Sequence, residues 1–434
     1  MSRSMRTLGM YCALLCCLPT HSLWAQEDPE VAGFDYILGS QTFGPSYHFT
    51  SEDAVVESAR ALKTMGSTLI KALGAESRED LLALSFRTTL SWYEDDGKFP
   101  WYDGVTAKEK QGIRDAAYAR TKTLLTRFNG TGRTFFLGHW EGDWQLLGGT
   151  TNPKEPSAAT LQGMIDWYNA RQQGIDEAKR DTPHQGVEVW QYAEVNKVRD
   201  AMTAGKQRIV NAVLPFTNVD FVSYSSYDIM RQGQAALDST LDYVASKLPA
   251  KPDLSGKRVF VGEFGISADE MAFDGIRHEK ANREIMIKFL KWGCPYILYW
   301  EMYNNEIKNG TQRGFWLIND KNEKQPLYNT LREFLAQARV YVADQKARSG
   351  KVPSADAFRG WAIAWLESYQ PTSPTFNRVS SLTGAKAGPA GFDRTTGTLY
   401  FALPGPGFPG SGFPGSGFPG QGRTTAKGAY FPAQ

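Results

Sequence analysis

Two glutamates occupy the same kind of position at two distant places in the chain. Glu263 follows the apolar run Val259-Phe260-Val261, and Glu141 follows the apolar run 134–137 (TFFL). A carboxylate at the end of a buried parallel strand points into the space where the loops of a barrel converge. Two carboxyl groups on opposite sides of a bond can act as a proton donor and as a nucleophile or base. The pair therefore predicts acid–base chemistry at one end of a parallel sheet.

The spacing of the acidic residues favours one pairing and leaves another open. Glu141 and Glu263 are 122 residues apart, which fits three strand–helix units of about forty residues each and places them on the fourth and seventh strands. Glu194 precedes Glu263 by only 69 residues, with one clear strand between them. The spacing favours Glu141 as the partner of Glu263. Glu194, with Asn196 two residues later, remains the alternative.

Apolar strand-like runs alternate with amphipathic helical runs through most of the chain. The expected strands are 33–39, 68–73, 87–92, 133–141, 187–192, 220–227, 258–265 and 296–300. The expected helices are 51–65, 77–84, 106–128, 157–180, 197–214, 235–248, 280–292 and 327–343. Eight such units predict an α/β fold, a (β/α)8 TIM barrel, over residues 26–345. A doubly wound open sheet is disfavoured, because no glycine-rich phosphate loop follows the first strand.

Both ends of the chain differ from this repeating pattern. Residues 1–25 combine Arg3 and Arg6 with an apolar stretch and a cleavage site, which is typical of a signal peptide and predicts a secreted or periplasmic protein. Residues 346–403 form a C-terminal extension with a further helix expected at 355–368. Residues 404–434 repeat Gly, Phe and Pro, a composition that predicts a disordered low-complexity tail.

The charge and the cysteine and histidine content argue against nucleic acid, a membrane span and a metal as binding partners. Removing residues 1–25 takes away two arginines and no acid, so the formal charge falls from +2 to 0. A neutral chain has no electrostatic footprint for nucleic acid, and no other stretch is typical of a membrane span. Only Cys294 then remains, which we expect to be a buried apolar residue. His48, His139, His184 and His278 do not have metal-ligand spacing, so we expect neither a metal nor another cofactor. The sequence does not indicate an oligomeric state.

Four strand ends carry a resemblance to a known clan. They are Trp140-Glu141, Tyr224 to Tyr227, Gly262-Glu263-Phe264-Gly265 and Tyr299-Trp300. Over about residues 33–340 the chain resembles the retaining glycoside hydrolases built on (β/α)8 barrels, which include cellulases, mannanases and xylosidases. The resemblance implies that Glu141 is the acid/base and Glu263 the nucleophile. It also implies that Tyr227 bonds near the nucleophile, that Trp300 is the platform for the −1 sugar, and that the substrate is a poly- or oligosaccharide.

The chain departs from this clan at one position. The clan has Asn immediately before its acid/base, where it contacts the sugar 2-hydroxyl, whereas this chain has Trp140. Either His139 takes over that contact or the substrate lacks the usual 2-hydroxyl. A third role for Glu194 is to hold Glu141 or a sugar hydroxyl by a hydrogen bond. The expected substrate-binding residues are His139, Trp140, Asp143, Trp144, Glu194, Asn196, Tyr224, Tyr227 and Trp300.

A non-catalytic carbohydrate-binding barrel is the alternative function. In that case the aromatic residues grip a glycan, and the glutamates only bond its hydroxyl groups. Carboxyl separations of about 5–5.5 Å are typical of retaining enzymes and about 6.5–9.5 Å of inverting enzymes. A binding protein has no such constraint.

Overall fold

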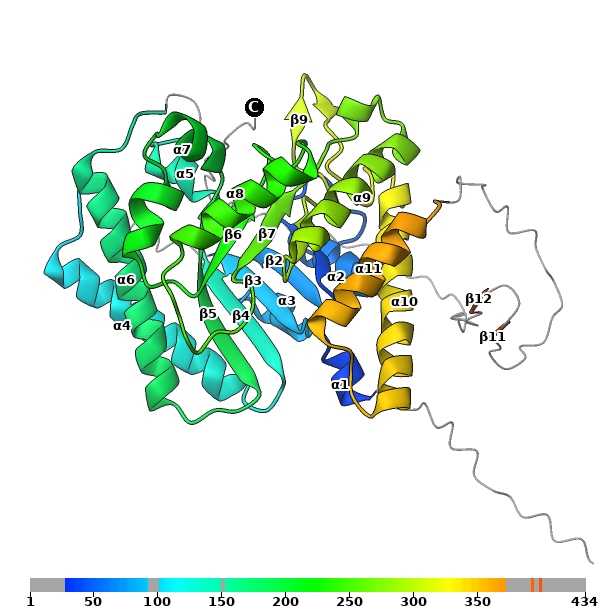
Figure 1. Cartoon of the computed structure of the whole chain (residues 1–434), viewed down its shortest axis with the longest axis horizontal. Coiled ribbons are helices and arrows are strands. Elements are labelled where there is room, and N and C mark those ends of the chain that lie inside the picture. Colours follow the sequence, from blue (N-terminus) through cyan, green and yellow to red (C-terminus); the bar gives the residue numbers. More distant parts are fainter. Residues whose placement is uncertain (1–27, 93–100, 150–152, 372–391, 394–397, 400–434) are drawn as a thin grey trace, which may run out of the picture.

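The computed structural model describes residues 28–92, 101–149, 153–371, 392–393 and 398–399. Eight parallel strands pair in chain order, and β8 pairs with β1 to close a barrel (Figure 1). The strands are β1 (Leu38–Thr42), β2 (Leu69–Leu73), β3 (Thr88–Trp92), β4 (Arg133–Gly138), β5 (Val187–Val195), β6 (Phe221–Ser225), β7 (Val259–Phe264) and β8 (Ile297–Tyr299). The predicted TIM barrel is confirmed, and the closed sheet excludes the open doubly wound alternative.

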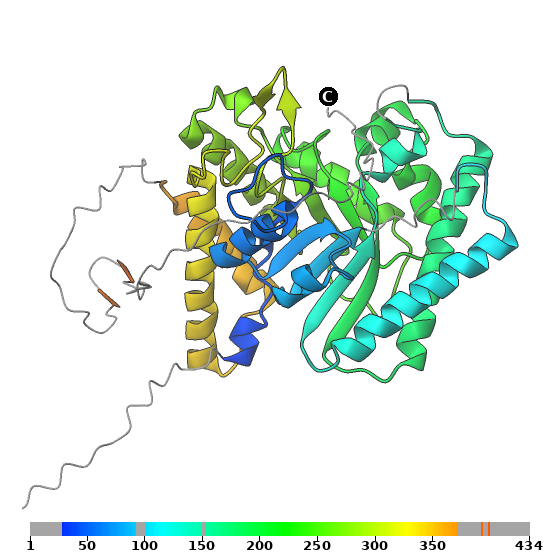
Figure 2. The ribbon, with the colours of Figure 1, turned by 180° about the vertical axis from the view of Figure 1, so that it is seen from behind.

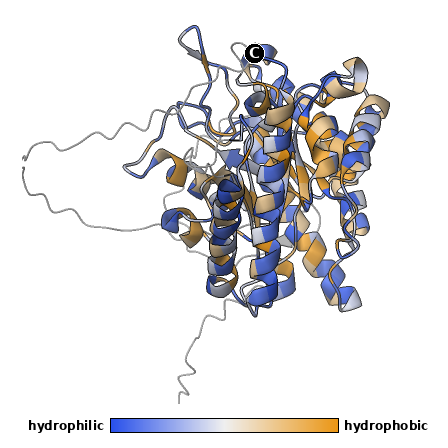
Figure 3. Ribbon diagram, turned by 90° about the vertical axis from the view of Figure 1, so that its left-hand side faces the viewer, coloured by the Kyte–Doolittle hydropathy of each residue, from blue (hydrophilic) through white to orange (hydrophobic). Residues whose placement is uncertain are grey.

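Helices surround the barrel on the outside (Figures 1 and 2). The longer ones are α2 (Ala54–Met65), α4 (Ala107–Arg127), α6 (Ala158–Asp181), α8 (Gln234–Lys247), α9 (Gly275–Trp292), α10 (Pro326–Ser349) and α11 (Ala355–Ser368). Short helices are α1 (Pro29–Ala32), α3 (Glu79–Ala83), α5 (Gly142–Leu146) and α7 (Val198–Ala204). Hydrophobic and hydrophilic residues alternate along the helices in Figure 3, as expected when one face packs on a core.

The capping residues explain where two of these helices begin and end. The Asp53 side chain accepts hydrogen bonds from the N–H groups of Val55 and Val56 at the start of α2, and Gly66 ends this helix with φ 105°. The C-terminal boundary agrees with the predicted helix 51–65, whereas the helix begins three residues later than predicted. Thr106 and Glu109 form a reciprocal capping box at the start of α4.

Large apolar side chains fill the barrel below its C-terminal end. Leu90, Phe136, Phe260 and Leu298 belong to one buried cluster drawn from different strands. The rings of Phe136 and Phe260 meet edge to face, with centroids 5.8 Å apart. The barrel is therefore packed rather than open along its axis, which leaves the C-terminal strand ends as the place for a site.

Several predicted boundaries were wrong, and three of them bear on the site. β4 ends at Gly138, so Glu141 lies three residues beyond the strand, whereas β5 continues to Val195 and includes Glu194. The single helix expected over 197–214 is α7 followed by a π-helix, Ile209–Val213 (η1), and a 3-10 turn, Leu214–Phe216 (η2). Gly205, with φ 64°, ends α7 and breaks the helical run.

The segment after the barrel packs on its outer helices. The predicted helix at 355–368 is confirmed as α11, which lies against α9 and α10, and α10 itself continues to Ser349. The ring of Phe358 in α11 contacts Tyr36 and Phe334. Further on, β11 (Phe392–Asp393) pairs antiparallel with β12 (Thr398–Leu399).

The signal peptide at 1–25 and the low-complexity tail at 404–434 lie outside the described residues. Within the residues that are described, no helix has the length and apolar character needed to cross a membrane. Cys294 is buried, as expected, and burial raises the pKa of its thiol.

Candidate active site

Three glutamates meet at the C-terminal end of the barrel. Glu263 lies at the end of β7, Glu194 at the end of β5, and Glu141 in the loop after β4. Because all eight strands are parallel, the loops that follow them surround one mouth. A buried cation also reaches this mouth, since Lys71 near the end of β2 extends its ammonium group between the carboxylates.

Glu194 is the most heavily bonded of the three glutamates. Its Oε2 accepts from Lys71 Nζ at 2.6 Å and from Ser223 Oγ at 2.6 Å. Its Oε1 accepts from the backbone N–H of Glu141 at 2.9 Å and from Ser225 Oγ at 3.2 Å. The carboxylate is fully buried, and each of its oxygens accepts at least one hydrogen bond that is not shared with another acceptor carboxylate, from Ser223 to Oε2 and from the Glu141 N–H to Oε1. Neither oxygen is exposed to a substrate.

Glu263 faces a different set of donors. The hydroxyl of Tyr227 donates to Oε1 at 3.0 Å, and Ser225 Oγ lies 3.1 Å from Oε2. Lys71 Nζ is 3.9 Å from Oε2, further than it is from Glu194. Since the Ser225 hydroxyl has one proton, it donates to Glu194 or to Glu263 at any moment. Ser225 therefore links the two carboxylates.

Glu141 has an unusual backbone conformation. Its φ of 40° lies in the left-handed region that non-glycine residues seldom adopt, and it precedes the first residue of α5. The hydrogen bond from Glu141 N–H to Glu194 and the bond from Trp144 N–H to Glu141 O hold this conformation on both sides. The side chain is partly exposed, in contrast to those of Glu194 and Glu263.

Burial and neighbouring charge give the three carboxyl groups different acidities. Burial, followed by the charges of Glu263 and Glu194, raises the pKa of Glu141 well above its usual range. Burial also raises the pKa of Glu263, to about 7, although Lys71 opposes the shift. For Glu194 burial acts in the same direction, but Lys71 and the donated hydrogen bonds outweigh it and lower the pKa. Glu194 is thus held as a carboxylate beside two groups that retain protons more readily.

Aromatic rings from the C-terminal ends of four strands or the loops after them form a wall beside these carboxyl groups. The ring of Phe43, after β1, lies 5.5 Å from Trp92, 5.6 Å from Trp140 and 6.3 Å from Trp300, measured between centroids. Lys71 Nζ lies 5.4 Å from the centroid of the Trp92 ring. Trp140 is partly exposed, whereas Trp300 is only 3% exposed.

His139 is enclosed behind this wall. Its Nε2 lies 3.1 Å from the N–H of Glu194 and bonds with the hydroxyl of Tyr168, and the side chain is buried. Burial lowers the pKa of His139 to about 3, so the imidazole is neutral. These contacts align β5 with the loop after β4.

Asp143 and Asn196 bond to each other's backbone. Asp143 Oδ2 accepts from the N–H groups of Asn196 and Lys197 at 2.9 and 3.1 Å, and Oδ1 accepts from Ile209 N–H at 2.8 Å. Asn196 Oδ1 accepts from the N–H of Asp143 at 3.0 Å. This pair joins the loops after β4 and β5 to η1.

The other expected binding residues are placed as follows. Trp144 carries Lys197 Nζ over its ring at 3.5 Å, which covers one face of the indole. Tyr224 is buried and donates its hydroxyl proton to Asp228, away from the glutamates. Tyr227 bonds to Glu263, and Trp300 belongs to the aromatic wall, as described above.

Sequence reasoning missed Lys71, Ser225, Phe43 and Glu301 as parts of the site. Lys71 was detectable, because a lysine within the apolar strand TLIKAL needs a buried partner. Glu301 follows Trp300 through a cis peptide bond and accepts from Phe43 N–H at 2.9 Å. The positions of Ser225 and Phe43 beside the carboxylates depend on strand register and loop path, which carry no local sequence signal. Among the described residues, no group of three or more His, Cys, Asp or Glu side chains is arranged to hold a metal.

Comparisons with known proteins place the chain far from each of them. No family model and no curated protein matches the sequence. Among solved structures, the chain is similar to a family 39 glycoside hydrolase from Bacteroides cellulosilyticus, at 13% sequence identity and with a TM-score of 0.46. The match covers 72% of this chain and 65% of that chain. The chain thus spans about two thirds of that enzyme's length.

Two further solved structures show likeness of the same order. A family 39 β-xylosidase from Caulobacter crescentus has 12% identity over 70% of this chain and 72% of that one, with a TM-score of 0.44. A broad-specificity family 5 endoglucanase from Clostridium longisporum has 11% identity over 72% and 99%, with a TM-score of 0.44. The solved structures to which the chain is similar are thus glycoside hydrolases, at low identity.

Proposed function

We propose that this protein is a retaining glycoside hydrolase acting on a poly- or oligosaccharide, with Glu263 as nucleophile and Glu141 as acid/base. One observation carries the proposal. A continuous set of hydrogen bonds runs from the Glu141 backbone through Glu194 and Ser225 to Glu263, so that both glutamates are held at one barrel mouth. The same set gives the two side chains unequal surroundings, which a proton donor and a nucleophile require.

The residues divide the work as follows. The proton on Glu141 passes to the departing glycosidic oxygen while Glu263 attacks the anomeric carbon and forms a glycosyl ester. Tyr227 and Ser225 orient Glu263 by donating hydrogen bonds to its two oxygens. Glu141, now a carboxylate, takes a proton from water, and the resulting attack on the anomeric carbon releases Glu263. Burial and the charges of Glu263 and Glu194 keep Glu141 protonated before the first step.

Glu194 serves as a positioning residue and not as the acid/base. It is fully buried, and both oxygens are engaged by Lys71, Ser223, Ser225 and the Glu141 N–H. A group with a lowered pKa and no free oxygen is unsuited to protonate a leaving group. Its bond to the Glu141 backbone instead sets where the acid/base side chain begins.

The aromatic wall favours a neutral sugar chain as the substrate, because indole and phenyl faces stack on the apolar faces of sugar rings. Export follows from the features of residues 1–25, so we place the enzyme outside the cytoplasm, secreted or periplasmic. A non-catalytic glycan-binding barrel is the outcome that the following experiment distinguishes.

The test is hydrolysis of a panel of glycans and aryl glycosides by wild type, Glu141→Ala and Glu263→Ala, each with and without azide. We expect Glu141→Ala to lose roughly 10²–10⁴-fold in kcat/KM on glycans. The loss should be smaller on aryl glycosides, because their aryloxide leaving group departs without being protonated. Azide should rescue both variants as glycosyl azides of opposite anomeric configuration. Glu177→Ala, which removes an acid between α4 and α6, is the control and should match wild type.

If wild type binds a glycan without releasing sugar, and both variants bind it equally well, the catalytic assignment is wrong. The barrel is then a carbohydrate-binding scaffold. If Glu141→Ala retains full activity on every glycan, the acid/base assignment is wrong.

A further inference from the structure

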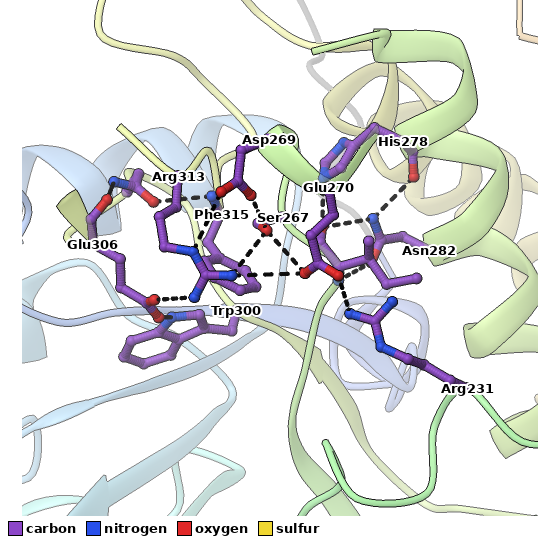
Figure 4. A network of polar contacts seen from close by, with 12 residues as sticks. Arg231, Ser267, Asp269, Glu270, His278, Asn282, Trp300, Glu306, Arg313 and Phe315 are labelled. Atoms are coloured by element: carbon purple, nitrogen blue, oxygen red, sulfur yellow. Dashed lines mark hydrogen bonds and ion pairs between the residues drawn. The ribbon is translucent and has the colours of Figure 1, made fainter. Parts of the chain in front are cut away.

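Arg313 ties together the two loops that follow β7 and β8 (Figure 4). Its Nη1 lies 2.9 Å from Glu306 Oε2, its Nε 3.6 Å from Asp269 Oδ2, and its Nη2 3.7 Å from Glu270 Oε1. Nη2 also donates to Ser267 Oγ at 3.3 Å. The side chain is 17% exposed, so these pairs are only partly screened by water.

The backbone of the same loops is joined at the same place. Arg313 N–H donates to Glu306 O at 2.9 Å, and Arg313 O accepts from Asp269 N–H at 2.9 Å. A short hairpin of β9 (Ile307–Lys308) and β10 (Thr311–Gln312) lies between Glu306 and Arg313. The Glu306–Arg313 pair therefore closes the base of this hairpin, while Arg313 also binds the loop after β7.

The two carboxylate oxygens of Glu306 accept hydrogen bonds from different partners, one from Arg313 and the other from a residue of the aromatic wall. Its Oε1 accepts from the indole N–H of Trp300 at 3.2 Å, and its Oε2 faces Arg313. Figure 4 shows the indole beneath this carboxylate, with Arg313 on the other side. The Trp300 ring also lies against Phe43. The orientation of the indole is thus set by a charged acceptor that is itself held by a cation.

We propose that Glu306, held by Arg313, is a positioning residue that fixes the orientation of the Trp300 indole within the aromatic wall. The proposal rests on the proposed function, because it takes the aromatic wall to be part of the glycan site. The shape of that wall depends on the direction of the Trp300 ring, and a buried indole N–H that loses its acceptor turns to find another. Glu306 then acts on substrate through Trp300 alone.

The charge arrangement allows Glu306 to be replaced without leaving Arg313 as a lone cation. Asp269 and Glu270 remain beside Arg313 when Glu306 is replaced, so the cation keeps partners. Glu306→Gln keeps a neutral acceptor for the indole N–H, whereas Glu306→Ala removes it. Arg313→Met keeps Glu306 but frees its orientation. Glu177→Ala and Arg114→Met remove partners of a comparable ion pair between α4 and α6 and serve as matched controls.

The first measurement is the indole N–H resonance of Trp300 in the free protein, assigned by its loss in Trp300→Phe. We expect the resonance to move in Glu306→Ala and to broaden in Arg313→Met. It should stay near its wild-type position in Glu306→Gln, and it should not change in the two controls. An unchanged resonance in Glu306→Ala overturns the proposal. This measurement needs no substrate, so it decides the positioning role even if the protein hydrolyses nothing.

The second measurement is glycan binding in the Glu263→Ala background, where turnover does not interfere. Glu306→Ala should weaken binding roughly tenfold, the loss of one charge-assisted hydrogen bond, and Glu306→Gln should restore most of it. In a Trp300→Ala background, Glu306→Ala should cause no further loss, because its effect passes through the indole. If the two losses add, Glu306 does not act through Trp300 and the proposal is wrong. If no glycan binds the parent protein, the proposed function fails while the resonance test still stands.

Discussion

At the scale of single residues, one lysine separates the roles of three glutamates. Lys71 Nζ is 2.6 Å from Glu194 and 3.9 Å from Glu263, and its charge lowers the pKa of Glu141 less than burial and the two other glutamates raise it. The cation therefore stabilises the charge on Glu194 most. The carboxylate of Glu263 is stabilised by the charge of Lys71 and, beyond that, by the hydroxyl donors Tyr227 and Ser225. This dependence gives a measurable pH effect.

Replacing Tyr227 by Phe should move the acidic limb of the pH–activity profile to higher pH. Glu263 must be ionised to act as nucleophile, and its pKa is about 7. The Tyr227 hydroxyl stabilises the ionised form, so its removal raises this pKa further and activity begins at higher pH. We expect the limb of kcat/KM to shift up by roughly half a unit to one unit.

The matched control for this shift is Tyr224→Phe. Its hydroxyl donates to Asp228 and does not contact Glu263, so the same chemical change should leave the limb where it is. Equal shifts in both variants, or no shift in Tyr227→Phe, would show that the limb belongs to a different group.

At the scale of elements, the loops at the mouth are held by buried side chains that bond backbone. Asp143 in α5 accepts three N–H groups, from the exit of β5 and from the start of η1. It is fully buried, and those donors have no water to replace it. α5 begins directly after Glu141, so Asp143 also fixes the position from which the Glu141 side chain, the proposed acid/base, extends.

Asp143→Ala should lower the free energy of unfolding by roughly 3 kcal/mol, because three buried N–H groups lose their acceptor. The measurement is denaturant unfolding of purified protein, with Asp115→Ala, an exposed change on α4, as control. A midpoint equal to that of wild type would mean that water or another group satisfies these donors, and that the loops are held by other contacts.

The same elements show what the sequence could and could not predict. Apolar strand runs and caps such as Asp53 and Gly66 are local signals, and they located seven strands and most outer helices. The first strand was wrong, because β1 begins at Leu38 and the prediction placed it at 33–39. Glu141 itself adopts a left-handed backbone conformation beyond the end of β4. Because it is not glycine, no local sequence signal predicts this conformation. The role of Glu194 depends on its pairing opposite Ser223 across β5 and β6. Register of that kind depends on packing of the whole barrel.

At the scale of the whole molecule, the barrel carries several buried carboxyl groups at its C-terminal end. Burial raises the pKa of Glu141 and Glu301 well above the usual range, that of Glu263 to about 7 and that of Asp228 to about 6. A folded protein that keeps these carboxyl groups protonated becomes less stable as pH rises, because the same groups ionise in the unfolded chain at lower pH. The site is therefore maintained at the expense of stability at neutral and higher pH.

Glu301 provides the test of this relation, because it is buried and lies outside the proposed catalytic pair. One of its oxygens accepts from Phe43 N–H, and the other has no partner among the described residues. The pKa of Glu301 is raised in the folded protein. As pH rises above about 4.5, this carboxyl group ionises in the unfolded chain but stays protonated in the folded one, which favours unfolding.

The variant Glu301→Gln cannot ionise, and any packing cost of the amide is the same at every pH. The Tm of the variant relative to wild type should therefore increase between about pH 5 and about pH 8. The exposed change Glu188→Gln should show no such trend. A difference in Tm that stays constant with pH would mean that Glu301 is ionised in the folded barrel, with a counter-charge that balances it.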